Sequence, residues 1–276
     1  MKIRKELKKS IVNIWFILPC ILLCLLSGIQ NYLKISEYNE IMGEILKSDL
    51  SVNPCLHIYT SFTMWIGNDT STVFSTIFFS ISPLIAAIPY SWSLCKIIKS
   101  GELTSNNISS QYYFNKFVSV FISSGLLIAI PLSMNFIVTS LFVPSVTPDS
   151  VYDIYYGIFS NDFGGQLFYT LPYVYILSFI LLNFVFYGLF GCIGLYVSIF
   201  FKRKIVSIIT PAIIIYSIEL LKKRFFTNLS IEISPISFLC PIKAVSCNHI
   251  LIITEIAIML LVTLVFPITR GGSDET

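Results

Sequence analysis

Six apolar stretches constrain this chain more than any other feature of its sequence. Five of them contain no Asp, Glu, Lys or Arg, and the sixth is interrupted once, by Glu255. A helix needs about 20 apolar residues to cross the hydrocarbon core of a bilayer. We therefore expect an all-α membrane protein with six transmembrane helices. The stretches cover residues 11–33, 70–95, 117–148, 163–201, 205–218 and 251–269.

The small number of charged residues excludes a soluble protein of this length. Hydrophobic residues make up 55% of the 276 residues and charged residues only 12%, whereas soluble domains carry about 25% charged residues. We expect a single transmembrane domain over residues 1–276, with the shortest apolar stretch in its fifth span. The predicted spans are 11–32, 72–95, 117–143, 171–200, 205–221 and 250–268.

The distribution of basic residues predicts that the N-terminus and the C-terminus are both cytoplasmic. Cytoplasmic loops of membrane proteins collect Lys and Arg, and this orientation places 12 of the 18 basic residues on the cytoplasmic side. Lys222, Lys223 and Arg224 oppose the bias, because they follow the fifth span on the outer side. Either that span is re-entrant, or the basic cluster is tolerated there.

Two polar segments have helical spacing. Residues 1–10 carry five basic residues, and Ile3 and Leu7 share one helix face. This segment is either an interfacial helix on the inner leaflet or a disordered basic tail. In the first outer loop, three acids recur at helical spacing and predict a solvated helix face. These acids are Glu37, Glu40 and Glu44.

The sequence contains no catalytic or ATP-binding motif, so we do not expect an enzyme. HExxH, GxSxG and GxxxxGKS/T patterns are absent, and neither histidine has a second ligand at metal spacing. Two acids, Glu219 and Glu255, lie in apolar surroundings, where a mid-bilayer carboxylate costs roughly 2.5–3.5 kcal/mol. They are candidates for a transport path, although Glu255 is near enough to the end of its span to reach the interface.

Glycines and cysteines leave two structural questions open. Gly188, Gly191 and Gly194 recur at every third position of the fourth span. Small residues allow close helix contact, either with another subunit or within this chain. Cys240 and Cys247 are the simplest pair for a disulfide on the outer side, and free thiols are the alternative.

Short motifs in the loops and spans follow one another in a recognisable order. They are KSGEL at 99–103, YYFNKF at 112–117, LPYVY at 171–175, Asn183-Phe184, Gly188, FFKRK at 200–204, Pro211 and SPISFL at 234–239. In this order they resemble the type-2 ABC transporter permease family, in particular the small permeases of Gram-positive bacteria. One departure is at 109–111, where Ser-Ser-Gln replaces the family's basic residues.

The resemblance implies a permease subunit of the bacterial plasma membrane that pairs with separate ATPase subunits. ATP and Mg²⁺ would bind the ATPase, and no cofactor would bind this chain. The cytoplasmic loop between the second and third spans would dock on the ATPase as a coupling loop, and a broken outer segment would precede the sixth span. A second permease, identical or related, would complete the transport path. The implied coupling residues are Ser100, Gly101, Glu102, Leu103, Tyr113 and Lys116.

The function that the resemblance implies is ATP-driven export. Spans rich in Phe and Ile suit an amphipathic or lipid-like substrate, and small permeases of this kind commonly export antimicrobial or bacteriocin-like peptides or confer immunity to them. A non-transporting sensor or scaffold subunit on the same fold is the main alternative. An ion-coupled secondary transporter and a membrane enzyme are further alternatives, but no internal repeat favours the first and no catalytic constellation favours the second.

Overall fold

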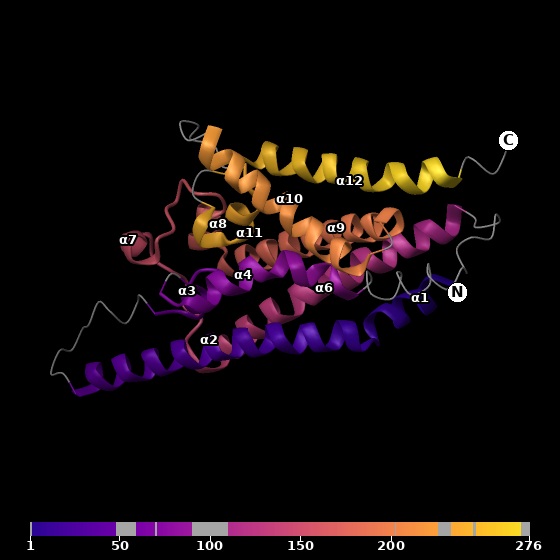
Figure 1. The fold of residues 1–276 in the computed structure, drawn as a ribbon. Coiled ribbons are helices and arrows are strands. Elements are labelled where there is room, and N and C mark those ends of the chain that lie inside the picture. The colour runs from indigo at the N-terminus through magenta and orange to yellow at the C-terminus, as the bar shows by residue number, and fades with distance from the viewer. Residues whose placement is uncertain are drawn as a thin grey trace.

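The structure is a computed structural model that describes residues 2–47, 59–69, 71–89, 110–201, 203–225, 233–244 and 247–271. These residues form helices of very different lengths, and no strand occurs among them (Figure 1). In chain order the elements are α1 (Lys2–Ile11), α2 (Ile14–Lys47), α3 (Ser61–Met64), α4 (Val73–Ala86), α6 (Ser110–Phe142), η2 (Ser150–Tyr152), α7 (Asp153–Tyr156), α8 (Gly165–Thr170), α9 (Pro172–Phe201), α10 (Lys204–Phe225), α11 (Pro235–Leu239), η3 (Pro241–Lys243) and α12 (His249–Gly271).

Four helices in the described ranges are long and apolar enough to cross a bilayer, which indicates a membrane protein. They are α2, α6, α9 and α10, and each overlaps one predicted span. α12 coincides with the sixth predicted span, whereas α4 covers only the first part of the second, and residues 90–95 of that span lie outside the described residues. The described apolar segments of these two helices are shorter, Val73–Ala86 and His249–Leu264. The all-helical character is thus confirmed, whereas the number of spans established by helix length is four.

The fifth predicted span, the shortest in the sequence, is one of these four helices. α10 is continuous over 22 residues, although it contains Pro211. At 1.5 Å per residue it is about 33 Å long, comparable with a hydrocarbon core of about 30 Å. The basic cluster Lys222, Lys223 and Arg224 forms its last turn. A continuous helix of this length does not turn back within the membrane, so the cluster lies at the far end of α10.

The bundle is built around α6 and α9, which make its most extensive helix contact. α2 packs on α6, α10 packs on α9, and α4 contacts both α2 and α10. The two ends of the bundle differ (Figure 1). We call the end with α1 and the last turn of α12 the α1 end, and the end with α3, α7, α8 and α11 the α7 end.

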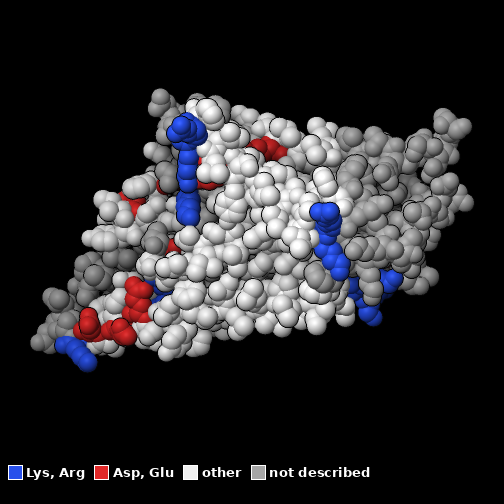
Figure 2. All heavy atoms as spheres, in the orientation of Figure 1, with Lys and Arg blue, Asp and Glu red and all other residues white. Residues whose placement is uncertain are grey.

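The basic N-terminal segment is helical and belongs to the bundle. α1 packs against α6, and Ser10 at its end is buried. The alternative of a disordered tail is therefore wrong, while the position of α1 on a membrane leaflet stays a prediction. On the face shown in Figure 2, acidic side chains gather toward the α7 end, and the charged side chains visible toward the α1 end are basic.

α2 presents apolar residues outward and polar residues inward. Ile17, Leu18 and Ile21 are among its exposed side chains. Its buried residues instead include Ser27, Gln30, Asn31 and Lys34, which follow the i, i+3, i+4, i+7 spacing of one helix face. This inverted arrangement suits a helix whose outer face meets lipid, and it brings a row of polar side chains into the bundle. The other exposed apolar residues on the outer face of α2 are Leu22, Leu25, Ile29, Tyr32 and Leu33.

Candidate functional site

Polar side chains from three segments meet in the interior toward the α7 end. Gln30, Asn31 and Lys34 come from α2, Asp69 comes from the connection between α3 and α4, and two further residues come from α6. We call these six residues the polar cluster, and each has at most 8% of its surface exposed. Buried polar groups are costly unless they are hydrogen-bonded, so the partners of each group decide what the cluster does. The two residues from α6 are Asn135 and Thr139.

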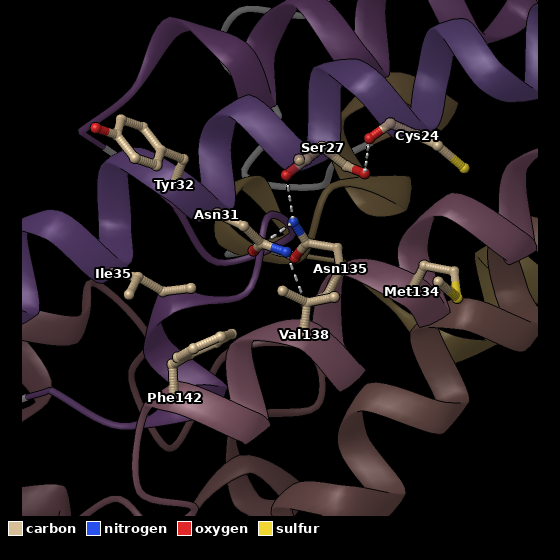
Figure 3. Close-up of a pocket in the computed structure, with 10 residues that line it drawn as sticks. Cys24, Ser27, Asn31, Tyr32, Ile35, Met134, Asn135, Val138 and Phe142 are labelled. Carbon is tan, nitrogen blue, oxygen red and sulfur yellow. Dashed lines mark hydrogen bonds between the residues drawn. The ribbon is translucent and has the colours of Figure 1, made fainter.

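Asn135 is the centre of the polar cluster. Its Nδ2 donates to Gln30 Oε1 at 2.9 Å and to Asn31 Oδ1 at 2.8 Å, and it lies 3.0 Å from the carbonyl oxygen of Ser27. Its Oδ1 accepts the backbone N–H of Ile66 at 3.0 Å. Figure 3 shows the contacts of Asn135 with α2. Through Ile66, the same side chain of α6 also holds the segment that follows α3.

Thr139 lies one turn after Asn135 and extends the contact between α6 and α2. Its hydroxyl oxygen lies 2.8 Å from Asn31 Oδ1 and 2.8 Å from the carbonyl oxygen of Asn135, and its single proton is donated to one or the other. Asn31 Nδ2 in turn donates to that same carbonyl oxygen at 3.2 Å. The amide of Asn31 is therefore engaged on both its oxygen and its nitrogen by α6.

Asp69 is the charged member that joins the connection to α2. Its Oδ2 accepts Gln30 Nε2 at 3.0 Å, and its Oδ1 accepts the backbone N–H groups of Ser71 and Thr72 at 3.0 and 3.2 Å. The Lys34 ammonium lies 3.6 Å from Oδ1. The side chain of Asp69 has no exposed surface, so its charge is balanced inside the protein. Because Thr72 is the residue before α4, Asp69 also fixes where α4 begins.

The arrangement positions helices relative to one another. Each amide and carboxylate of the polar cluster is used to join α2, α6 and the segment around Ile66 and Asp69. Interhelical hydrogen bonds of Asn, Gln and Thr hold membrane helices together in this way. In the described part of the chain, no group of three His, Cys, Asp or Glu side chains could hold a metal ion.

A cavity of about 420 Å³ lies beside the polar cluster, between α2 and α6 (Figure 3). Asn31, Asn135 and Ser27 form its polar side, and the remaining walls are mainly apolar. Gly28 also lines it, and a Cβ atom built on Gly28 would meet no atom within 4 Å. The remaining lining residues are Cys24, Tyr32, Ile35, Met134, Val138 and Phe142.

A second contact lies at the α1 end, where α1 meets the beginning of α6. Lys116 Nζ lies 2.6 Å from Glu6 Oε2, and Lys116 has only 5% of its surface exposed. Tyr113 belongs to the first turn of α6. Lys116 was expected in the coupling loop, and the structure places it under α1, where a partner reaches it only if α1 moves. The other coupling residues, Ser100, Gly101, Glu102 and Leu103, lie outside the described residues.

The two candidate transport-path acids are on different helices. Glu219 is in α10, and its Oε1 lies 2.9 Å from the ammonium of Lys223, one turn further along. Its side chain is 17% exposed, and that of Lys223 is 69% exposed. This ion pair offsets the unfavourable placement of a carboxylate beside apolar residues. Glu255 is half-buried in the second turn of α12, so the structure does not join the two acids into one cluster.

Two of the three spaced glycines form a contact within the chain. A Cβ on Gly188 would lie 2.8 Å from the carbonyl oxygen of Phe121, and one on Gly191 would lie 2.1 Å from Ser124 Oγ. Both neighbours belong to α6, so Gly188 and Gly191 serve intramolecular packing. Gly194 is also buried.

The predicted outer disulfide is absent from the structure. Cys240 is a free, buried cysteine, and its Sγ lies 3.9 Å from the carbonyl oxygen of Gly67. It is therefore not bonded to Cys247. Cys240 separates α11 from η3, the two short helices that precede α12. Asn183 Nδ2 donates to the carbonyl oxygen of Leu239 at 3.0 Å, which anchors this segment on α9.

Sequence reasoning did not identify the polar cluster, although a signal for it exists. Gln30 and Asn31 lie near the end of the first apolar stretch, and Asn135 and Thr139 lie four residues apart within the third. Polar side chains inside a predicted span usually face the bundle interior. The spacing would have selected these residues, but it could not have shown that the two pairs bind each other.

Comparisons of the chain with models of protein families, with curated proteins and with solved structures find no match.

Proposed function

We propose that this chain is the membrane-spanning permease subunit of an ATP-driven ABC exporter and works with a separate ATPase subunit. The contact between α1 and α6 carries the proposal. Lys116 is the last residue of the predicted coupling loop, and it forms the ion pair with Glu6 of α1. A displacement of that loop would therefore reach both α1 and α6, and through α6 the centre of the bundle.

The arrangement of helix ends supports the same function. The beginning of α6, the end of α9 and the beginning of α10 lie toward the α1 end, as does the end of α12 (Figure 1). An ATPase bound at this end would contact several connections at once. We place the α1 end in the bacterial cytoplasm, because described basic residues such as Arg4, Lys8 and Arg203 gather there and cytoplasmic segments collect Lys and Arg.

A second permease, identical or related, would complete the transport path. The exposed apolar faces of α10 and α12 are suited to contact with lipid or with such a partner, since Ile213, Leu220, Ile253 and Leu261 are all exposed on them. We propose an amphipathic peptide or a lipid-like molecule as the substrate, because the bundle exposes few charges between its two ends (Figure 2).

Affinity purification from the native membrane tests the partnership. The tagged full-length chain should co-purify with a protein that carries a GxxxxGKS/T phosphate loop. The loop variants Gly101→Trp and Glu102→Lys should reduce the amount of this ATPase. Glu44→Lys, a charge reversal in the part of α2 that extends toward the α7 end, is the matched control and should leave it unchanged. Absence of such an ATPase, or equal recovery with all variants, would contradict the proposal.

ATPase activity separates an exporter from a sensor or scaffold. The purified complex is reconstituted in nanodiscs, and its ATP hydrolysis is measured with and without cationic amphipathic peptides or lipid-like compounds. An exporter should hydrolyse ATP faster when its substrate is present, and should move that substrate into sealed inverted vesicles. Stable association without any stimulated hydrolysis or transport would favour the sensor or scaffold function.

A further inference from the structure

The cavity between α2 and α6 has the size and lining of a ligand site. Its volume of about 420 Å³ is within the range of roughly 300–1,000 Å³ that is usual for small-molecule pockets. Such pockets combine mainly apolar walls with a few fixed polar groups. Ile35, Met134, Val138 and Phe142 provide apolar walls here, and the amides of the polar cluster provide the polar side.

The polar side of the cavity offers little to a polar ligand. Asn31 Oδ1 already accepts a hydrogen bond from Asn135 and lies 2.8 Å from the Thr139 hydroxyl oxygen, and the Asn135 amide is engaged on both of its atoms. The Ser27 hydroxyl donates to the carbonyl oxygen of Cys24 at 3.0 Å. A ligand that required several hydrogen bonds would have to displace these contacts. The remaining surface favours an apolar ligand.

The entrance of the cavity faces the same side as the apolar surface of the bundle. Tyr32, Met134 and Phe142 line the cavity, and they have 73%, 49% and 61% of their surfaces exposed. They continue the exposed apolar face of α2 that begins near Ile14. In a membrane this face meets acyl chains, so the cavity opens to the hydrocarbon region. Water gains little there, because an apolar cavity gives it too few hydrogen-bond partners.

We propose that this cavity binds one acyl chain of a bilayer lipid. The lining is mainly apolar and is continuous with the exposed apolar face of α2, so the flexible hydrocarbon chain of a neighbouring lipid is the occupant that this environment supplies. Gly28 leaves the interior open, since no atom lies within 4 Å of the position of its missing Cβ.

Acyl-chain binding requires no ATPase, so it is tested on the isolated full-length chain. The protein is reconstituted in nanodiscs of phosphatidylcholine that contains a fraction of lipid with a diazirine in one acyl chain. After irradiation, the labelled peptides are identified by mass spectrometry. Labelling of Met134 and Val138 in the cavity should exceed labelling of Ile21 and Leu25, which are on the outer face and report ordinary contact with bulk lipid.

Two substitutions in α2 form a matched pair for this experiment. Gly28→Leu fills the cavity and should reduce labelling of Met134 and Val138 by about tenfold, which corresponds to about 1.4 kcal/mol of lost binding. Labelling of Ile21 should stay constant. Gly43→Leu is the control, because a Cβ on Gly43 also meets nothing within 4 Å while Gly43 does not line the cavity. Val138→Phe fills the cavity from the α6 side. It replaces Gly28→Leu in the experiment if that variant does not fold.

Three results would overturn the proposal. Equal labelling of the cavity residues and of Ile21 and Leu25 in the wild type would indicate contact with bulk lipid only. Equal labelling in wild type, Gly28→Leu and Val138→Phe would show that the chain does not enter the cavity. Labelling of Met134 and Val138 far below that of Ile21 and Leu25 would show that protein, such as a second copy of the chain, covers the entrance.

Discussion

The two sides of α6 are joined to their neighbours by different physical means. Toward α9 the contact is close and uses small residues: a Cβ on Gly125 would lie 2.6 Å from the carbonyl oxygen of Phe184, and one on Gly188 would lie 2.8 Å from that of Phe121. Toward α2 the contact uses the hydrogen bonds of Asn135 and leaves a cavity of about 420 Å³. One helix therefore has a side without free space and a side that retains it.

The difference between the α6–α9 and α6–α2 contacts predicts which substitutions each contact tolerates. Dispersion forces hold the α6–α9 contact, so it loses stability when an atom is added and the helices must separate. Hydrogen bonds hold the α6–α2 contact, so it loses stability when a polar partner is removed. Additions next to the cavity should be tolerated, and additions between α6 and α9 should not.

Removal of the Asn135 amide should have the largest effect. Asn135→Leu eliminates four side-chain contacts and leaves the N–H of Ile66 without its acceptor. We expect a decrease of roughly 3 kcal/mol in the free energy of unfolding, since an unsatisfied buried group costs about 1–3 kcal/mol. Unfolding by increasing SDS in mixed micelles measures it. Ser140→Ala, five residues further along α6, should change it by less than about 0.5 kcal/mol. Equal effects would refute the central role of Asn135.

Addition of one methyl group between α6 and α9 should have the next largest effect. Gly188→Ala should lower the free energy of unfolding by about 2 kcal/mol, because overpacking costs about 1–3 kcal/mol and the added Cβ would lie 2.8 Å from both the ring and the carbonyl oxygen of Phe121. Gly43→Ala should instead raise it by up to about 1 kcal/mol, the difference in helix propensity. The same micelle assay gives both values, and a shared sign would remove the contrast between crowded and open positions.

The ion pair between Lys34 and Asp69 allows a sharper test of the polar side. We expect a coupling of about 1.5 kcal/mol in a double-mutant cycle of Lys34→Met and Asp69→Asn, within the range of about 0.5–3 kcal/mol for residues in contact. Glu37 Oε2 lies 2.8 Å from the same ammonium, so it retains part of the balance of the Lys34 charge when Asp69 is neutralised. A repeat of the cycle in a Glu37→Gln background measures how much of the coupling energy Glu37 masks. Additive effects of Lys34→Met and Asp69→Asn would mean that this pair adds nothing to the amide contacts.

The contact between α1 and α6 should show the smallest effect on global stability. Glu6→Gln removes the charge opposite Lys116 and should lower stability by about 1 kcal/mol, because Glu6 is partly exposed. Its local effect should be larger. Hydrogen exchange of the α1 amides should accelerate in Glu6→Gln, while exchange in α9 should not change. Unchanged exchange in α1 would mean that its apolar contacts alone hold it against α6.

The sequence predicts the long helices well because a lipid-facing span must be apolar along its whole length. Both predicted limits of the fourth span, 171 and 200, lie within one residue of the ends of α9. The third span was predicted to end at 143, close to the end of α6 at Phe142. α2 is the exception, since it continues from the predicted limit at residue 32 to Lys47. Hydropathy reports where lipid ends, and the helix continues beyond that point. The helical spacing of Glu37, Glu40 and Glu44 predicted a solvated helix face in the outer loop, and all three residues lie in this helical extension.

The polar cluster could not be derived in the same way. Asn31 and Asn135 are 104 residues apart, and no local pattern states which spans are neighbours. The cavity is harder still, because it depends on a missing side chain at Gly28 and on the distance between two helices. Lys116 illustrates a further limit: the resemblance implied a residue that contacts the ATPase, and no local pattern showed that α1 would cover it.

The length of α2 and the position of its anchor have a mechanical consequence. The helix has 34 residues, and Asn31, which α6 holds through Asn135 and Thr139, is at its middle. Any tilt of α2 therefore pivots about Asn31, inside the bundle. A tilt of about 10° about Asn31 displaces Lys47 by about 4 Å, given 1.5 Å per residue, and displaces Ile14 by a similar distance in the opposite direction. A displacement of the α2 end that carries Glu37, Glu40 and Glu44 thus produces a displacement in the opposite direction at Ile14, next to α1.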